Sequence, residues 1–123
     1  MLKCGLKYSI AVEVAPQNTA LAMGSGDMEV FATPAMVALM ENAAMNAVAE
    51  FLPDGSATVG TKIDVSHVKA SPMGAKITSE AELVAVDGRR LEFKVVAYDE
   101  KGVIGEGNHT RFVVDKERFL AKL

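Results

Sequence analysis

Apolar residues run almost without interruption from Phe31 to Phe51, and this pattern predicts one long helix. Most of the stretch consists of Ala, Met and Leu, which are strong helix formers. Thr33 and Pro34 suit its start, as an N-cap and a first-turn proline, and Pro53-Asp54-Gly55 suits its end. A helix that is apolar on nearly all sides is normally buried. We therefore expect a core helix.

One carboxylate interrupts this apolar helix. Glu41 is the only charged side chain between Ala35 and Ala49. Burying a carboxylate is costly unless it is paired or its pKa rises. The setting of Glu41 alone leaves a structural role and a chemical role equally open.

Alternating polar and apolar residues predict five strands around this helix. One strand precedes the helix and four follow it: Lys7–Val14, Thr58–Lys69, Lys76–Val86, Leu91–Tyr98 and Val103–Val114. Residues 17–30 are predicted as a loop or lid, and residues 116–123 as a short amphipathic tail. Asp87-Gly88 is a strong signal for a two-residue hairpin.

The short turns between the last four strands favour antiparallel neighbours. The sheet has to cover an apolar face, and the only long helix is the apolar one. The sequence therefore predicts an α+β fold in which a five-stranded antiparallel sheet curls around a central helix. Such a small sheet has free edges that invite pairing between copies, so a homodimer with side-by-side sheets is expected, and a higher homo-oligomer stays open.

Composition narrows the class of protein. At 123 residues the chain is expected to be a single domain, residues 1–123. The net charge of −3 argues against nucleic acid as a main partner. The single cysteine, Cys4, fits a reducing compartment, and no apolar run reaches membrane-spanning length, so a soluble cytoplasmic protein is expected. No His and Cys residues have metal-ligand spacing, so no metal site is expected.

Three residues are candidates for chemistry. Thr33 is most simply an N-cap. His67 falls on the apolar face of its predicted strand, together with Val59, Thr61, Ile63 and Val65 and opposite Gly60, where a lone histidine is most simply a hydrogen-bonded core residue. A carboxylate and an imidazole on two elements that pack together can, however, catalyse acyl transfer, and a helix N-terminus suits an oxyanion.

The chain resembles a known family at these residues. The run ATPAMVALMENAA, followed by VGTKIDVSH, resembles the fluoroacetyl-CoA thioesterase-like family of the hot-dog fold. The resemblance covers nearly the whole chain. In that family a Thr near the helix start, a Glu eight residues later and a His a further twenty-six residues on form the catalytic triad, and Thr33, Glu41 and His67 have this spacing.

The resemblance implies hydrolysis of a small acyl-CoA thioester. It implies that Glu41 is the nucleophile or the base for water, that His67 is the general acid and base, and that Thr33 holds the carbonyl. It assigns substrate contacts to Gly60 and Arg111. It implies no metal and no bound cofactor, because CoA is part of the substrate, and it implies basic side chains that meet the CoA phosphates.

The lid departs from the family pattern. The fluoroacetyl-specific enzyme closes its pocket with aromatic residues before the helix, whereas the lid here reads ALAMGSGDM and contains no Phe or Tyr. A short or medium acyl chain therefore fits better than fluoroacetyl.

Other functions remain as alternatives. The main one is a non-catalytic acyl-CoA-binding module, which would bind the thioester without turnover. An enoyl-CoA hydratase on the same fold would need an Asp and a His close together in a hydration motif, which the sequence lacks. A purely structural dimerisation domain gives no reason for a carboxylate inside an apolar helix.

Overall fold

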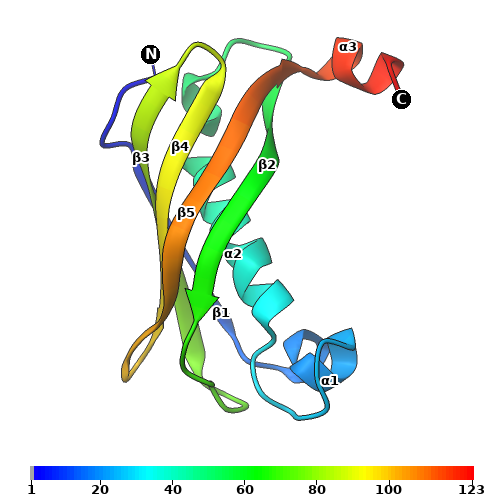
Figure 1. Ribbon diagram of the computed structural model, residues 1–123, viewed down its shortest axis with the longest axis vertical. Coiled ribbons are helices and arrows are strands. Elements are labelled where there is room, and N and C mark those ends of the chain that lie inside the picture. Colours follow the sequence, from blue (N-terminus) through cyan, green and yellow to red (C-terminus); the bar gives the residue numbers. More distant parts are fainter. Residues whose placement is uncertain (1) are drawn as a thin grey trace.

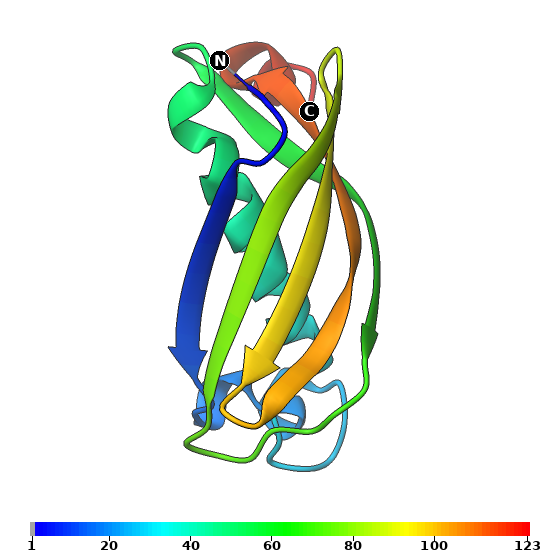
Figure 2. The same cartoon turned by 90° about the vertical axis from the view of Figure 1, so that its left-hand side faces the viewer.

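A five-stranded antiparallel sheet bends around one long helix in the computed structural model, which describes residues 2–123 (Figure 1). The helix, α2, spans Thr33–Val48 and continues as a 3-10 turn, η2, over Ala49–Phe51. The strands are β1 (Lys7–Glu13), β2 (Ser56–His67), β3 (Lys76–Asp87), β4 (Arg90–Asp99) and β5 (Gly102–Asp115). Their order across the sheet is β1-β3-β4-β5-β2 (Figure 2). The predicted α+β fold is confirmed.

The core lies between the concave face of the sheet and one side of α2. Alternate residues of β3 and β4 are buried there, among them Ile77, Ala81, Leu83, Leu91, Phe93, Val95 and Ala97. They meet the buried side of α2, which consists of Met36, Leu39, Met40, Ala43, Ala44, Ala47 and Val48. Period-two burial on the strands and period-3.6 burial on the helix are what the sequence pattern requires.

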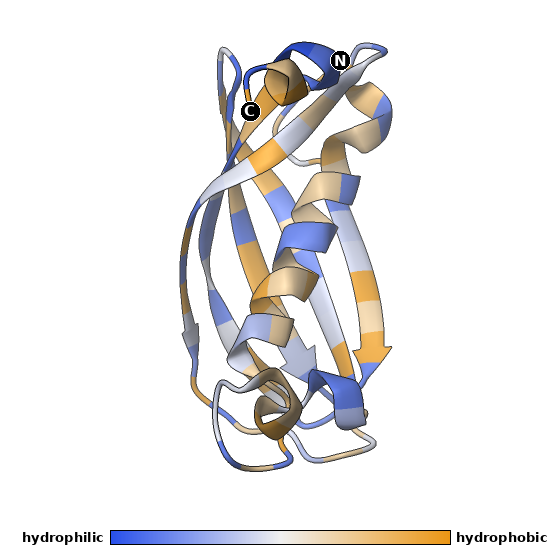
Figure 3. Cartoon of the chain, turned by 90° about the vertical axis from the view of Figure 1, so that its right-hand side faces the viewer, coloured by the Kyte–Doolittle hydropathy of each residue, from blue (hydrophilic) through white to orange (hydrophobic). Residues whose placement is uncertain are grey.

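Within one protomer the predicted core helix, α2, is buried along one side only. The sheet covers one side of α2 and leaves the other side open (Figure 3). Pro34, Ala38 and Met45 are exposed. Glu41 lies on this open side and is half-buried. The apolar character of α2 therefore exceeds what its own sheet covers, and Glu41 avoids the full cost of burial.

The segment predicted as a loop contains two short helices. A 3-10 turn, η1, spans Pro16–Asn18, and α1 spans Ala20–Met23, where the hydroxyl of Thr19 caps it by accepting a hydrogen bond from the Ala22 N–H. Gly24 ends α1 in the left-handed conformation, at φ 74°. The predicted C-terminal tail forms α3, Lys116–Ala121.

The buried carboxylate of Asp99 connects the β4–β5 turn to the loop after β2 through hydrogen bonds. Asp99 accepts hydrogen bonds from the Lys69 ammonium at 3.0 Å, the Ser71 hydroxyl at 3.2 Å, and the Lys101 and Gly102 N–H groups at 2.8 and 3.1 Å. The bond from Lys69 is the main reason why the pKa of Asp99 falls to about 2. Charge-assisted bonds of this kind favour the ionised form.

This pKa predicts acid-sensitive stability. The folded pKa lies below the unfolded value, so the contribution of Asp99 is present above about pH 4 and is lost as the pH falls from 4 towards 2. Because Lys69 is partly exposed, we expect roughly 1 kcal/mol. Urea unfolding at pH 7, 4 and 2.5 measures it. Asp99→Asn should lose stability at pH 7 and show a smaller drop towards pH 2.5, and an equal drop in both proteins would contradict the assignment.

Candidate active site

Two of the predicted catalytic residues meet where α2 begins and β2 ends. The Thr33 Oγ1 atom lies 2.7 Å from the His67 Nδ1 atom. Thr33 is the first residue of α2, and its N-cap is Ala32, which has no side chain able to cap. The prediction that Thr33 caps the helix is therefore wrong. Its hydroxyl bonds to His67 instead.

The environment of His67 keeps its imidazole neutral. Burial lowers the pKa of His67 below its usual value of 6.5, and the backbone of Lys69 opposes this shift more weakly. The Nε2 atom of His67 is buried and has no hydrogen-bond partner among residues 2–123. A neutral imidazole beside a hydroxyl is a nucleophile–base pair, and a buried ring nitrogen without a partner is suited to a substrate group or a water molecule.

A cleft of about 270 Å³ opens beside this pair. It is bounded by α1 and the lid on one side and by the end of β2 and the following loop on the other. Its lining consists of Ala20, Ser25, Val30, Phe31, Thr33, His67, Val68, Lys69 and Ala70. The Thr33–His67 pair is thus accessible to a small ligand.

Glu41 lies in a different place within the same protomer. Two turns of α2 separate it from Thr33, about 12 Å along the helix axis at 1.5 Å per residue. No hydrogen bond among the described residues joins Glu41 to Thr33 or His67. The structure of one protomer therefore brings together two of the three predicted catalytic residues and leaves the third apart.

The residues around Glu41 are those predicted to contact substrate. A Cβ atom placed on Gly60 would lie 2.9 Å from the Glu41 Oε2 atom, 3.1 Å from His109 Cε1 and 3.3 Å from Arg111 Nη1. A side chain at position 60 would therefore displace the carboxylate, the imidazole or the guanidinium. Glycine keeps this space open.

Arg111 is held rigidly beside Glu41. It is buried, and its Nε and Nη2 atoms donate to the hydroxyl and the carbonyl of Thr58, both at 2.8 Å. Its Nη1 atom lies 3.2 Å from His109 Nε2. Burial lowers the pKa of Arg111, and the nearby charge of Glu41 acts in the opposite direction. Nη1 keeps an N–H free for the space over Gly60, because a guanidinium carries five donors.

His109 helps to hold Arg111 in place. Its Nδ1–H donates to the Lys62 carbonyl at 2.7 Å, so Nε2 is the atom that accepts from Arg111 in the neutral ring. Burial is the main cause that lowers the pKa of His109 and keeps the ring neutral. Thr58 and His109 thus orient Arg111. Sequence reasoning missed Thr58, because simple alternation placed it with Gly60 on the face opposite the apolar one.

A β-bulge explains why both clusters face α2. The register of β2 against β5 shifts between Gly60 and Lys62. Gly60 and His67 are seven positions apart, so in a regular strand they would point to opposite faces, as the sequence predicted. One extra residue at the bulge reverses the alternation. The predicted shared face of Val59, Thr61 and His67 is therefore wrong.

Comparison with known proteins agrees with this architecture. The chain is similar to crystal structures of the fluoroacetyl-CoA-specific thioesterase FlK, with 38% identity, a TM-score of 0.92, and coverage of 99% of this chain and 95% of that one. A thioesterase superfamily member from Thermus thermophilus is 26% identical at a TM-score of 0.89, over 98% of this chain and 89% of that one. A hot-dog-like protein from Thermanaerovibrio acidaminovorans shares the fold. It is 22% identical, with a TM-score of 0.88 and coverage of 97% of this chain and 88% of that one. The molecule is thus a hot-dog fold thioesterase.

Sequence comparison defines the family within this class. The model of the fluoroacetyl-CoA-specific thioesterase family matches residues 14–117. The fluoroacetyl-CoA thioesterase of Streptantibioticus cattleyicolor is 47% identical over 95 residues, which cover 77% of this chain and 68% of the relative. The chain belongs to the fluoroacetyl-CoA-specific thioesterase family.

Proposed function

We propose that this protein hydrolyses short or medium acyl-CoA thioesters to the free acid and CoA. The observation that carries the proposal is the 2.7 Å contact between the Thr33 hydroxyl and His67, at the mouth of a cleft and beside an unpartnered imidazole nitrogen. The family relationship and the FlK structure in complex with fluoroacetate and CoA support the substrate class.

In the first step Thr33 acts as the nucleophile. The neutral imidazole of His67 takes the hydroxyl proton as Oγ1 attacks the thioester carbonyl carbon. The carbon–sulfur bond breaks, the imidazolium gives its proton to the departing CoA sulfur, and the acyl group stays on Thr33. The developing oxyanion lies near the N-terminus of α2, where free N–H groups and the positive end of the helix dipole stabilise negative charge.

In the second step water releases the acid. His67, neutral again, takes a proton from the attacking water, and the acyl–oxygen bond to Thr33 breaks as the hydroxyl regains its proton. The steps use only side chains and water, without a metal or a bound cofactor. The assignment differs from the expectation that Glu41 is the nucleophile or the base for water, because the group that contacts the His67 imidazole is the hydroxyl of Thr33.

Glu41 and Arg111 contribute through a dimer. Strand β2 is one edge of the sheet, is twelve residues long, and is largely exposed from Gly60 to Asp64. It lies next to the open side of α2, where Met45 is 40% exposed and Ile63 37%. A long, exposed edge flanked by apolar side chains is suited to pairing with a second copy.

The spacing of residues on β2 means that such pairing would bring the two clusters of site residues together. If two β2 strands pair antiparallel about a two-fold axis at Asp64, Ile63 of one protomer lies opposite position 65 of the other, and the bulge between Gly60 and Lys62 brings position 60 opposite position 67. The Thr33–His67 pair then faces Gly60, Glu41 and Arg111 of the partner subunit. That carboxylate can orient the attacking water, and the free N–H of that guanidinium can bind the acyl group.

The lid argues for an acyl group other than fluoroacetyl. Residues 17–30 contain no aromatic side chain, and Gly24-Ser25-Gly26 leaves the cleft without bulky closure. The named relative acts on fluoroacetyl-CoA. For this protein we propose activity across short and medium acyl chains rather than selectivity for the fluorinated one.

Thiol release from a panel of acyl-CoAs tests the proposal. We expect continuous CoA release with acetyl-, butyryl- and hexanoyl-CoA, whereas a binding module would bind stoichiometrically and release nothing. Cys4 is a free, exposed cysteine, so the assay should use Cys4→Ser to exclude a background of one thiol per chain. Binding measured by calorimetry without any turnover would favour the non-catalytic alternative.

A further inference from the structure

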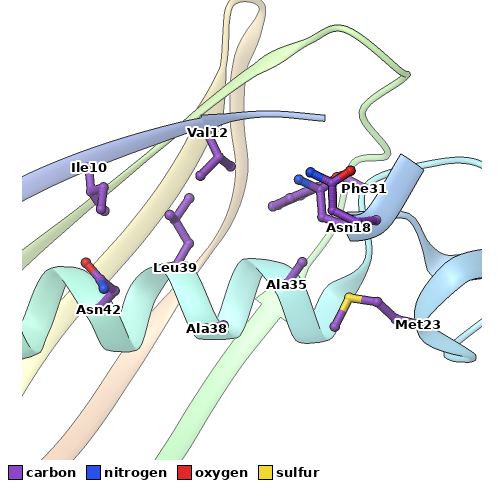
Figure 4. Close-up of a pocket in the computed structure, with 10 residues that line it drawn as sticks. Ile10, Val12, Asn18, Met23, Phe31, Ala35, Ala38, Leu39 and Asn42 are labelled. Atoms are coloured by element: carbon purple, nitrogen blue, oxygen red, sulfur yellow. The ribbon is translucent and has the colours of Figure 1, made fainter. Parts of the chain in front are cut away.

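A second, larger cavity lies behind the catalytic cleft. It measures about 380 Å³, within the range of small-ligand sites, and it opens between β1, the lid and the side of α2 that faces β1. Figure 4 shows Ile10, Val12, Ala35 and Leu39 around this space. Gln17, Asn18, Met23, Phe31, Ala38 and Asn42 complete the lining.

The chemistry of this cavity suits a hydrocarbon chain. Its lining is mainly apolar, with amides of Gln17, Asn18 and Asn42 and no ionisable side chain. The Asn18 amide is already bonded to the backbone of Ala15 and Glu13. A phosphate would find no cation there, whereas an alkyl chain would exchange water for apolar contacts.

Among residues 2–123, Phe31 is the one that lines both hollows. It belongs to the lining of the Thr33–His67 cleft and to that of the second cavity. It is 1% exposed, and its N–H donates to the Ser71 carbonyl at 3.0 Å. It also forms a β-bridge with Thr19. These interactions hold the backbone of Phe31, which lies two residues before the reactive hydroxyl.

We propose that Phe31 is the partition that sets the length of the acyl chain. With the ring in place, the acyl group is confined to the cleft of about 270 Å³ at Thr33. Without it, the cleft joins the apolar cavity, and a longer chain can extend between β1 and α2. The inference rests on the proposed thioesterase function and assigns Phe31 as a specificity-determining residue.

The test is a chain-length profile of Phe31→Ala and of the milder Phe31→Leu. The ratio of kcat/KM for octanoyl-CoA to that for acetyl-CoA should rise by about tenfold or more in Phe31→Ala, since each buried methylene contributes to discrimination. Phe31→Leu should show a smaller rise and carries the test if the alanine variant does not fold. Phe51 lies in η2, after the C-terminal end of α2, and lines neither hollow. The control Phe51→Leu, which also replaces an aromatic side chain, should leave the ratio unchanged.

A refilled cavity provides the reverse test. Phe31→Ala combined with Ala38→Leu should return the ratio towards that of the wild type, because the larger side chain fills part of the cavity that a longer acyl chain would enter. A ratio that stays the same in folded Phe31 variants that still hydrolyse acetyl-CoA would overturn the partition while leaving the proposed function standing.

A binding measurement separates the two proposals. In the His67→Ala background, calorimetry should show that Phe31→Ala tightens octanoyl-CoA relative to acetyl-CoA by a similar factor. This readout needs no turnover. If the wild-type protein hydrolyses none of the acyl-CoAs but Phe31→Ala still tightens octanoyl-CoA binding, the proposed function is refuted and the role of Phe31 as a partition is supported. If Phe31→Ala does not tighten octanoyl-CoA binding, the role of Phe31 is refuted.

Discussion

Replacing His67 by alanine is expected to lower kcat by about 10²- to 10⁴-fold, the usual contribution of a general acid–base group. The imidazole is the only side chain bonded to the Thr33 hydroxyl, and its Nε2 atom faces no other partner among residues 2–123. Steady-state thiol release measures the effect, and circular dichroism and thermal unfolding check the fold. A folded variant with near-full turnover would remove His67 from the mechanism.

Thr33 provides the matched comparison. Thr33→Ser keeps a hydroxyl and should retain most of the rate, whereas Thr33→Ala should fall nearly as far as His67→Ala, because the two residues act as one unit. If Glu41 were the nucleophile, Thr33→Ala would have only a modest effect. The lowered pKa of His67 also places the acidic limb of the kcat profile below pH 6.5, with activity lost as the imidazole becomes protonated.

The second large effect is expected from mixed dimers. Glu41→Ala and His67→Ala should each be nearly inactive as homodimers. In a heterodimer purified through two different tags, each site combines His67 of one protomer with Glu41 of the other. One site therefore carries both substitutions, and the other site carries none. Such a heterodimer should therefore recover about half of the wild-type kcat per dimer. If Glu41 works within its own protomer, both sites carry one defect and activity stays low.

The same experiment with Thr33→Ala and His67→Ala is its control. These two side chains touch within one protomer, so every site of that heterodimer lacks one of them, and no activity should return. Recovery in the first pair and not in the second would establish a shared site. Failure to isolate any heterodimer, together with a monomeric mass in solution, would reject it.

Most of the fold could be predicted because burial alternates so regularly. The inward residues of β3 and β4, such as Leu83 and Phe93, follow period two in the sequence and in the structure. Asp87-Gly88 forms the predicted hairpin, with Gly88 at φ 61°. The bulge at Gly60 could not be predicted, because one added residue leaves no mark in composition and still reverses the alternation along half of β2.

The site was predicted less completely than the fold. The family resemblance assigned Thr33, Glu41 and His67 as a triad, but linear spacing does not say whether two positions eight residues apart on a helix serve one site or two. The N-cap prediction for Thr33 failed because a residue one position earlier, Ala32, occupies the cap, and a tertiary contact claims the hydroxyl. Similarly, the fixation of Arg111 by Thr58 depends on strand pairing that a sequence does not display.

The two borders of the sheet differ in a way that limits its growth. Strand β1 has only seven residues, carries Lys7 and Glu13 at its ends, and leaves the upper part of β3 beyond its reach. If two chains join through β2, the combined sheet terminates on both sides in these short, charged strands. Such an assembly has no long exposed edge strand with which a third chain could pair. Pairing through the sheet edges would therefore stop at two chains and would not produce a fibre.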